Sequence, residues 1–552
     1  MAIERHGNVL GKLGSGAAWL RIGPWLIAAA ATTAVVLTLS PDGAGPGITC
    51  DEYYDARAGK ALVAALLRER LAFFNSTNID RNFGPLTLHP PLGRWLLGAT
   101  HWLFDPSRAE PFAVWIAAAR LAPALAFGAL VVIVGCTSGR ADGPLAGTAA
   151  AAATALVPNM FGHAHLATLD TFAAVSYVAA VLALVSAEER GAKTWHVLLA
   201  GAVWGLALLT KIQGFLLVVP VVAWFIWHRG WRGLAPMTIW ATTGLVVFFA
   251  GWPWLWVDPL ERMTRFLATA TDRQALHVFY LGRVWDDVAV PWHYPWVMFV
   301  VTMPVGLLLL GAVGVWSRRT EIWRDRRLSL LFVNLVWVLA VFSWPGTPVY
   351  DGIRLFLMVV PLWAVWVGLG TKWLAELPWL ARFSPRLRPI ALLAFLALQG
   401  VGIVIYHPVQ LSHYSLLVGG LFGAERLGFE VSYWGEAVRG PFLARAVPPV
   451  SNQCVLYGPH LAQFQALAVQ ATSRVLLENR VELIGWEPSD HAPDCRYAVI
   501  YHRRADLAAL DPLIRGGRVI AEDRRQGVWL ARWYASPPLP DERSRASNAP
   551  DA

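Results

Sequence analysis

Two short motifs near the N-terminus carry side chains that are suited to group transfer. The first is Asp51-Glu52, which lies shortly after an apolar segment at about 24–40. A carboxylate beside a bilayer is costly to place, so chemistry explains this pair better than packing does. Asp51 could accept a proton from an attacking hydroxyl, and such general-base catalysis is typically worth about 10²–10⁴ in rate. The alternative is that Asp51 caps a helix and Glu52 favours the dipole of its first turn.

The second motif is His89-Pro90-Pro91-Leu92-Gly93-Arg94. Its two prolines fix a turn and pre-organise the start of a helix. They do not explain the ionisable residues on either side of them. Both are suited to binding an anionic phosphate, His89 as a hydrogen-bond donor and Arg94 as a fixed cation.

A third motif, His163-Ala164-His165-Leu166-Ala167-Thr168-Leu169-Asp170, lies at the start of an apolar run. Asp170 begins this run, so a catalytic carboxylate and an N-cap are both open interpretations. The two histidines are spaced i, i+2 and do not share one face of a helix. We therefore predict no metal site, and a metal bound by these histidines is the weaker alternative.

Further ionisable residues lie at the ends of other apolar runs. Lys211 in Leu208-Leu209-Thr210-Lys211 can snorkel to the membrane interface or meet a lipid phosphate. In Val349-Tyr350-Asp351-Gly352-Ile353-Arg354, the residues Asp351 and Arg354 can pair with each other. A loop that holds Tyr, Asp, Gly and Arg against a membrane is also suited to a polar ligand.

The elements that position these residues are expected to be membrane-spanning helices. The chain has 552 residues, a mean hydropathy of +0.46 and only 15% charged residues, which indicates an integral membrane protein. Apolar runs long enough to cross a bilayer recur about eleven times. We place them near 24–40, 111–135, 143–158, 169–187, 196–210, 212–227, 236–257, 296–316, 328–344, 354–370 and 389–406.

Short loops rich in Arg and Lys alternate with loops that carry few cations, in agreement with the positive-inside rule. This pattern places Asp51, Asp170, Lys211 and the C-terminus on the extracytoplasmic side. The net charge of +9 comes mostly from these short loops and is not gathered on one soluble domain. The composition therefore argues against a nucleic-acid-binding protein.

Two extracytoplasmic loops are long, at about 41–110 and 258–295. In the first, Asp55–Ala72 separates basic from apolar residues and predicts a helix that lies in the membrane interface. The second contains Arg283 and His293, which are further candidates for binding a donor substrate. Both loops belong to a transmembrane module that we assign to residues 1–406.

A small extracytoplasmic α/β domain is predicted for residues 407–536. Strands are expected at 455–457, 481–484, 498–501 and 528–534, with helices near 459–470 and 505–514. Cys454 and Cys495 fall in this domain, where a disulfide and two free thiols are both open. The polar tail, residues 537–552, is predicted to be disordered.

Together these motifs resemble the GT-C glycosyltransferases. The Asp-Glu pair after the first span, the His-Pro-Pro-Leu-Gly-Arg turn, the loop ending in Leu169-Asp170 and the Leu209-Thr210-Lys211 sequence are similar, in this order, to family 39. That family includes protein O-mannosyltransferases and lipid A aminoarabinose transferases, and the resemblance covers about residues 20–370. It implies a polyprenyl- or dolichyl-phosphate sugar donor and an inverting transfer that needs no metal or other cofactor.

The resemblance also implies roles for individual residues. Asp51 matches the family's catalytic base, Asp170 matches its second acidic motif, and basic residues hold the donor phosphate. Two positions depart from the aminoarabinose transferases: Tyr54 stands where they usually carry a cation, and His89 stands where they carry a lysine. The sugar therefore stays open, and so does the acceptor, which can be a protein, a lipid or a glycan.

Two other classes compete with a glycosyltransferase. A transporter or flippase of polyprenyl-linked sugars predicts ionisable residues deep within spans and internal repeats, whereas here such residues lie at the outer ends and no repeat is evident. A non-catalytic assembly subunit would keep the fold but tolerate a change at Asp51. The Ala-, Trp- and Arg-rich composition is typical of a bacterium with GC-rich DNA, so we expect a multi-pass protein of the bacterial inner membrane.

Overall fold

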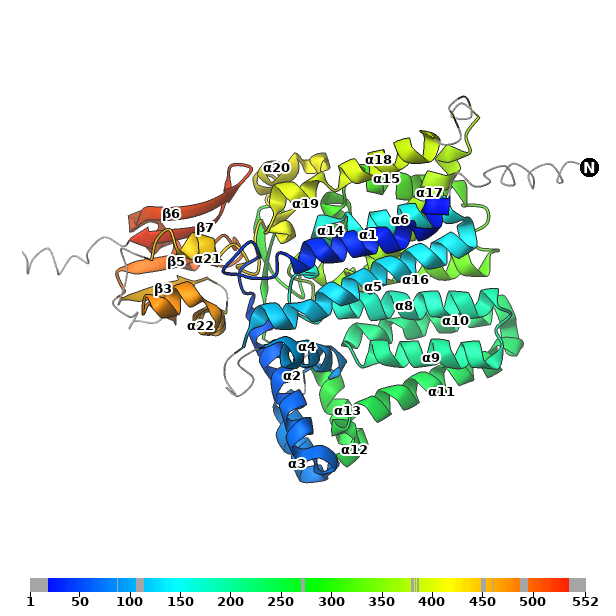
Figure 1. The fold of residues 1–552 in the computed structure, drawn as a ribbon, viewed down its shortest axis with the longest axis horizontal. Coiled ribbons are helices and arrows are strands. Elements are labelled where there is room, and N and C mark those ends of the chain that lie inside the picture. The colour runs from blue at the N-terminus through cyan, green and yellow to red at the C-terminus, as the bar shows by residue number, and fades with distance from the viewer. Residues whose placement is uncertain are drawn as a thin grey trace, which may run out of the picture.

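The computed structural model describes residues 18–535, except 87, 106–113, 270–273, 379–381, 383, 385–386, 448–452, 460 and 487–494. Long helices lie side by side, and a five-stranded sheet is attached at one end of them (Figure 1). We refer to this end as the sheet end. The tail predicted to be disordered, 537–552, lies outside the described residues.

Every predicted apolar run contains a helix. The helices of this bundle are α1 (Ala18–Val36), α5 (Ile116–Asp142), α6 (Pro144–Ala155), α8 (Asp170–Glu189), α9 (Thr194–Leu208), α10 (Val218–Arg229), α11 (Leu234–Gly251), α14 (Tyr294–Thr302), α15 (Val305–Ser317), α16 (Arg326–Phe342), α17 (Val359–Ala375), α18 (Leu387–Gln399) and α19 (Val401–Tyr406).

Five of the described helical stretches are both long and apolar enough to cross a membrane: Trp19–Val36, Ile116–Asp142, Asp170–Glu189, Ile212–Gly251 and Leu387–Tyr406. A sixth is added if α14 and α15, bent by 116° relative to each other, form one broken span. The predicted number of about eleven is not reached by this measure. The physical reason is that several runs fold as helices shorter than a full span, and that the 212–227 and 236–257 runs fall within one stretch. The multi-span helical architecture itself is confirmed.

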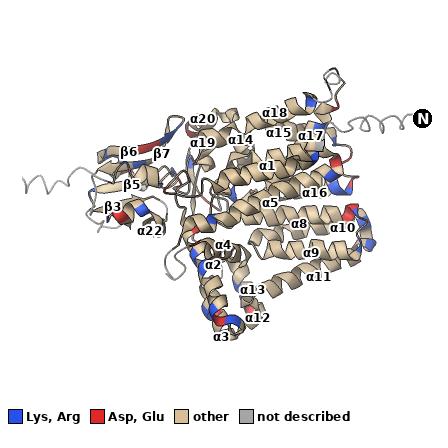
Figure 2. Ribbon diagram, in the orientation of Figure 1, with Lys and Arg blue, Asp and Glu red and all other residues tan. Residues whose placement is uncertain are grey.

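Charged residues gather near the ends of the long helices, whose middles carry few of them (Figure 2). At the end opposite the sheet, ion pairs join neighbouring helices. Arg229 contacts Glu188 at 2.8 Å and Arg327 contacts Asp142 at 2.7 Å. The basic loops predicted from the sequence therefore cluster at one end of the bundle.

The loop at 41–110 folds into helices at the sheet end: α2 (Cys50–Glu69), α3 (Ser76–Phe83) and α4 (Leu92–Phe104). A helix is thus present where an interfacial one was predicted, but it begins five residues earlier than Asp55, and its position in the membrane interface stays a prediction. Helix α4 begins directly after the two prolines. Helices α2 and α4 touch backbone to backbone, since a Cβ on Gly59 would lie 2.3 Å from the carbonyl oxygen of Arg94. Only glycine permits this approach.

The loop at 258–295 contains the short helices α12 (Trp254–Val257) and α13 (Pro259–Ala268) and a hairpin of β1 (His277–Tyr280) and β2 (Arg283–Asp286). This hairpin lies between the bundle and the C-terminal sheet. The backbone N–H of Gly282 at its turn donates to the carbonyl oxygen of Gly428.

The C-terminal sheet has the strand order β4-β3-β5-β7-β6. Its strands are β3 (Cys454–Gly458), β4 (Glu482–Gly485), β5 (Tyr497–Tyr501), β6 (Arg518–Arg525) and β7 (Val528–Ala535). β3 is parallel to β4 and β5, and β7 is antiparallel to β5 and β6. Four of these strands agree with the sequence-based expectation, as does the helix α22 (Ala462–Thr472).

Two features of this sheet were left open or missed by the sequence. A disulfide joins Cys454 to Cys495, which decides between the two alternatives. β6 was missed because its sequence, Arg-Val-Ile-Ala-Glu-Asp-Arg-Arg, is mostly charged. As an edge strand it tolerates charge on both faces.

A buried ion pair fixes the first turn of α2. Arg120 of α5 donates to both carboxylate oxygens of Glu52, at 2.7 and 2.8 Å, and the remaining guanidinium protons go to the carbonyl oxygens of Leu39, Pro46 and Gly47. Glu52 also accepts from the backbone N–H groups of Thr49 and Ala167. Both side chains are completely buried. Glu52 therefore binds the start of α2 to the bundle.

We expect Arg120→Ala to lower the free energy of unfolding by about 3–5 kcal/mol, because it leaves the Glu52 carboxylate buried and unpaired. The measurement is thermal unfolding of the purified protein in lipid nanodiscs. The matched control is Arg318→Ala, which removes an exposed pair with Glu321 and should cost no more than about 1 kcal/mol. Equal unfolding midpoints for the two variants would contradict an anchoring role for the buried pair.

Candidate active site

Six charged side chains from distant parts of the chain meet at the sheet end of the bundle. Each directly contacts at least one other by an ion pair. We call them the ion-pair cluster, and its members are Asp51, Asp170, Lys211, Asp351, Arg354 and Arg503. Five of the six were candidates from the sequence alone.

Arg354 is the centre of the cluster. It is the first residue of the short 3₁₀ helix η6 (Arg354–Phe356). Its Nε donates to Asp170 at 3.1 Å, its Nη1 donates to Asp351 at 3.0 Å, and its Nη2 donates to Asp51. One guanidinium thus holds three carboxylates from three separate segments.

Asp51 differs from the other carboxylates in its access to solvent. Its side chain is 34% exposed, against 2% for Asp170 and 3% for Asp351. The N-cap of α2 is Thr49, so Asp51 is the second helical residue and its side chain points to Arg354. The alternative that Asp51 caps this helix is therefore wrong.

Asp170 occupies the first position of α8, and the N-cap is Leu169. Its carboxylate is shared between Lys211, at 2.5 Å, and Arg354. The N-cap interpretation is wrong here too, because Leu169 holds that position and both carboxylate oxygens of Asp170 accept from cations of other segments. Lys211 is buried on Asp170 and does not snorkel to the interface.

Asp351 joins the bundle to the C-terminal sheet. It adopts a positive φ of 57°, which an aspartate tolerates better than most residues. Its Oδ1 accepts from Arg503 at 2.8 Å, and its Oδ2 accepts from Arg354 and from the indole N–H of Trp434 at 3.0 Å. The pairing of Asp351 with Arg354 predicted from their spacing is confirmed.

Trp434 forms one wall of the cluster. The guanidinium carbon of Arg354 lies 4.2 Å from the centre of its ring, a cation–π contact. Trp434 also contacts the buried imidazole of His163, whose ring centre is 5.5 Å from its own. Burial lowers the pKa of His163 to about 4, so this imidazole is neutral at neutral pH.

His89 lies near the cluster on the turn before α4. Burial lowers the pKa of His89 well below its usual value, and the charges of Lys211 and Arg94 lower it further. His89 is therefore a neutral hydrogen-bonding group at neutral pH and adds no charge to a phosphate site.

Arg94, predicted to bind phosphate, is instead engaged within the protein. Its Nε donates to Asp55 at 2.9 Å and its Nη1 donates to the carbonyl oxygen of Leu86 at 2.7 Å. In this structure it links α4 to α2, just beside the cluster.

Three other sequence candidates lie outside the cluster. Glu52 is occupied by Arg120, as described above. Arg283 is exposed on β2, and no hydrogen bond or ion pair between it and the cluster is found among the described residues. His293 is hydrogen-bonded to the hydroxyl of Tyr280 at 2.8 Å.

The sequence did not reveal Arg503, Trp434 or Arg120 as part of this region. Arg503 follows β5, and its Nη1 also donates to the carbonyl oxygen of Tyr433 at 2.9 Å. Nothing in the local sequence connects Arg503 with Asp351, 152 residues earlier.

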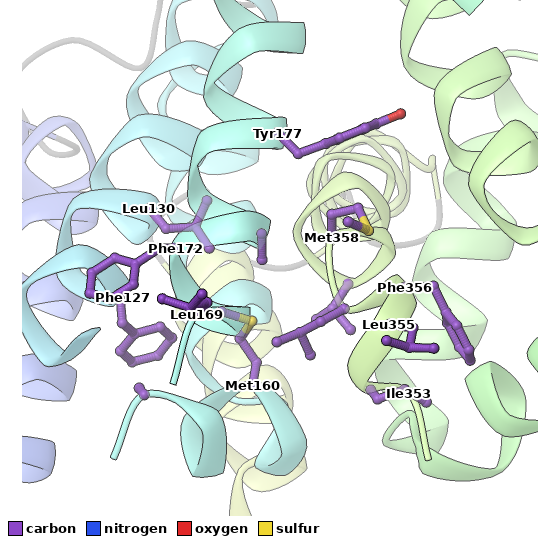
Figure 3. Close-up of a cluster of buried hydrophobic side chains, with 14 of the residues drawn as sticks. Phe127, Leu130, Met160, Leu169, Phe172, Tyr177, Ile353, Leu355, Phe356 and Met358 are labelled. Carbon is purple, nitrogen blue, oxygen red and sulfur yellow. The ribbon is translucent and has the colours of Figure 1, made fainter. Parts of the chain in front are cut away.

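An apolar cluster holds the backbone that carries Asp170 and Arg354 (Figure 3). Leu169 and Phe172 flank Asp170, and Ile353 and Leu355 flank Arg354. All are buried together with Met160 and Phe127. Because these side chains are packed, the two charged residues have little freedom to move apart.

No group of three or more His, Cys, Asp or Glu is arranged to hold a metal ion in the part of the chain that the structure describes. His165, the partner of His163 in the sequence motif, is hydrogen-bonded to Thr38 and to the carbonyl oxygen of Phe161. The independence from metal stays a prediction.

Comparison with known proteins agrees with this architecture. The chain is similar to ArnT from Cupriavidus metallidurans in the apo state, with a TM-score of 0.52 and 15% identity over 93% of this chain and 98% of that chain. The chain has the GT-C fold. The predicted fold class is thereby confirmed.

Two further matches accompany this one. ArnT from the same organism bound to undecaprenyl phosphate gives a TM-score of 0.52 and 15% identity. The match covers 95% of this chain and 100% of the ArnT chain. The Archaeoglobus fulgidus oligosaccharyltransferase in the apo form gives a TM-score of 0.47 and 12% identity. This match covers 95% of this chain and 76% of the oligosaccharyltransferase chain. No curated protein matches the chain by sequence.

Residues 88–256 match the family model of dolichyl-phosphate-mannose-protein mannosyltransferases. This range contains His89, Arg94, Asp170 and Lys211 of the GT-C fold. It does not contain Asp51, Asp351 or Arg354, which the structure brings to the same place.

We expect Asp170→Asn to destabilise the protein strongly, by about 3–5 kcal/mol, because Lys211 and Arg354 then lose the buried anion that they share. Asp51→Asn should cost no more than about 1 kcal/mol, since Asp51 is partly exposed and Arg354 keeps two carboxylates. Thermal unfolding of the two variants measures the difference. Equal losses would show that exposure does not separate the roles of the two aspartates.

A pH effect is expected from Glu436, which is 1% exposed beside the Trp434 wall. Burial raises the pKa of Glu436 from 4.5 to about 7, so the folded protein binds a proton that the unfolded chain has already lost. The contribution of Glu436 to stability should therefore fall as the pH rises from about 5 to about 7, whereas buried histidines such as His163, whose pKa is lowered, contribute in the opposite direction. Because glutamine resembles the protonated carboxyl, Glu436→Gln should be more stable relative to the wild type at pH 8 than at pH 5. Unfolding midpoints at pH 5 and pH 8 test this, and unchanged midpoint differences would refute it.

Proposed function

We propose that this chain is a glycosyltransferase that moves a sugar from a polyprenyl-phosphate donor to an acceptor hydroxyl, with inversion at the anomeric carbon. The observation that carries the proposal is the position of Asp51. It is the solvent-accessible carboxylate in a cluster whose other carboxylates are buried and committed to Arg354, Lys211 and Arg503.

The donor phosphate would be received by the cations of the cluster. Arg354 and Lys211 lie on opposite oxygens of Asp170 and can both contribute charge to a departing phosphate. His89 can add a hydrogen bond as a neutral donor. Undecaprenyl phosphate, which is bound in one of the similar ArnT structures, is a ligand of this chemical class.

In such a site the donor phosphate and Asp51 compete for the same guanidinium, that of Arg354. In the structure Nη2 of Arg354 is used by Asp51. A phosphate that binds Arg354 competes with Asp51 for this donor, and the released carboxylate oxygen can then accept a proton from the acceptor hydroxyl. The donor thereby prepares the base.

The bonds of the transfer balance without a metal or another cofactor. The acceptor oxygen forms a bond to the anomeric carbon while the bond from that carbon to the phosphate oxygen breaks. The proton of the hydroxyl passes to Asp51, and the electron pair leaves with polyprenyl phosphate. Since phosphate is already a good leaving group, the protein supplies a base, cations and orientation.

We place this reaction at the extracytoplasmic face of a bacterial inner membrane. The charge pattern of the loops supports this orientation, because the basic loops gather at the end opposite the cluster (Figure 2). A lipid-linked donor reaches the cluster from the membrane, and an acceptor reaches it from the aqueous side. A flippase or a non-catalytic subunit is the alternative, and neither requires a carboxylate at position 51.

The test is mass spectrometry of lipids from a native host that lacks its own copy of the gene and carries either the wild type or Asp51→Asn. We expect a polyprenyl-phosphate sugar to accumulate with Asp51→Asn, by about tenfold or more, and not with the wild type. The mass of this lipid would identify the sugar class.

The matched control is Asp511→Asn, which changes an exposed aspartate that pairs with Arg515 and is not a member of the cluster. Its lipid profile should equal that of the wild type. If the Asp51→Asn profile also equals the wild type while the protein is present at normal levels, the base assignment fails, and a flippase or assembly subunit becomes the better account.

A further inference from the structure

A cavity of about 490 Å³ lies between the C-terminal sheet and the loop that precedes β1. The sheet contributes residues that follow its parallel strands: Pro459 after β3, Trp486 after β4, and Asp506 after β5. The loop before β1 and the first residue of β1 contribute Gln274–His277. The cavity therefore lies at the interface between the C-terminal sheet and the rest of the molecule.

The topology of the sheet favours a ligand at this place. The chain leaves β3 toward β4 on one side, whereas β5 lies on the other side of β3. In open α/β sheets, ligands bind outside the carboxyl ends of parallel strands where the connections diverge in this way. Interfaces between structural units are also preferred sites for small ligands, and the volume is in the usual range of about 300–1,000 Å³.

The lining combines aromatic faces with hydrogen-bonding groups. Trp486 and Phe464 supply the faces, and Gln463, His277 and Asp506 supply polar atoms. A pyranose ring presents an apolar face for stacking on an aromatic ring and hydroxyls around its edge. A peptide strand would instead need a free sheet edge, but the cavity is at strand ends.

The cavity is physically connected to the candidate base. Asp506 binds Nε of Arg503 at 2.8 Å, and Arg503 binds Asp351, which binds Arg354, the partner of Asp51. A second connection is direct packing. The ring of Tyr54, three residues after Asp51 on α2, lies 5.7 Å from the ring of Phe464.

We propose that this cavity binds the acceptor and that the acceptor is a carbohydrate. The inference rests on the proposed function and extends it by naming the acceptor class and its site. An oligosaccharide with one ring between Trp486 and Phe464 would extend past Tyr54 toward the carboxylate of Asp51. The C-terminal sheet is then a specificity element for the transfer.

The experiment is saturation-transfer NMR with the full chain in nanodiscs of phosphatidylethanolamine and phosphatidylglycerol, which avoids glycoside detergents. The probes are mannobiose, chitobiose and maltose, with sorbitol and a Ser/Thr-containing peptide as comparison ligands. We expect at least one disaccharide to bind through the protons of a ring face. Trp486→Ala should weaken this binding about tenfold and Phe464→Ala about threefold.

Phe464→Ala is included because Phe464 is 55% exposed, so its loss should not affect folding. The matched control is Trp231→Ala, which removes an exposed tryptophan between α10 and α11 and should leave disaccharide binding unchanged. Binding of undecaprenyl phosphate, followed by native mass spectrometry, should be the same in all three variants.

Three results would overturn the proposal. One is that no disaccharide binds better than sorbitol. Another is that disaccharide binding is unchanged in both Trp486→Ala and Phe464→Ala. The third is that the peptide binds and loses affinity in these variants, which would assign the cavity to a protein acceptor. A failure of the glycosyltransferase assignment is separate, because it would appear in the lipid profile of Asp51→Asn and not in carbohydrate binding.

Discussion

The structure around the candidate site depends on one buried guanidinium. Arg354 cannot lose its proton, so in a buried position its charge has to be balanced by nearby anions. It finds them in Asp51, Asp170 and Asp351, which come from α2, from α8 and from the loop before η6. Removing charges from water costs free energy, and only ion pairs and hydrogen bonds of good geometry offset this cost. The packing of these three segments is therefore constrained by the requirements of one side chain.

Two further sets of contacts hold the carboxylates around Arg354 in place. On one side, Arg120 and Glu52 hold the first turn of α2, so that Asp51 is presented at a fixed place. On the other side, Arg503 and Trp434 hold Asp351. Since Arg503 follows a strand of the C-terminal sheet, this sheet completes the ion-pair cluster of the bundle. The two parts of the molecule are thus joined through this cluster.

The sequence predicted the helical runs and most of the cluster, because hydropathy and loop charge identify residues at span ends. Asp170, Lys211 and Arg354 were found for this reason. Apart from the local pair Asp351–Arg354, it could not predict which residues are partners, because the others come from distant segments. Arg94 and Glu52 have the chemistry of site residues, but Asp55 and Arg120 occupy them, and that is a matter of tertiary packing. Arg503 was missed because it belongs to a strand end in the part of the chain that reads as a separate domain.

Different degrees of burial give three chemically identical aspartates different roles. Asp170 and Asp351 are enclosed, and any change of partner would leave a charge unpaired at low dielectric. Asp51 alone among the three partners of Arg354 can exchange that bond for contact with water or with an incoming group, because a third of its side chain is exposed. A cluster built in this way keeps its cations in place while one carboxylate changes partner. That property is what a site needs if it is to bind a phosphate first and accept a proton afterwards.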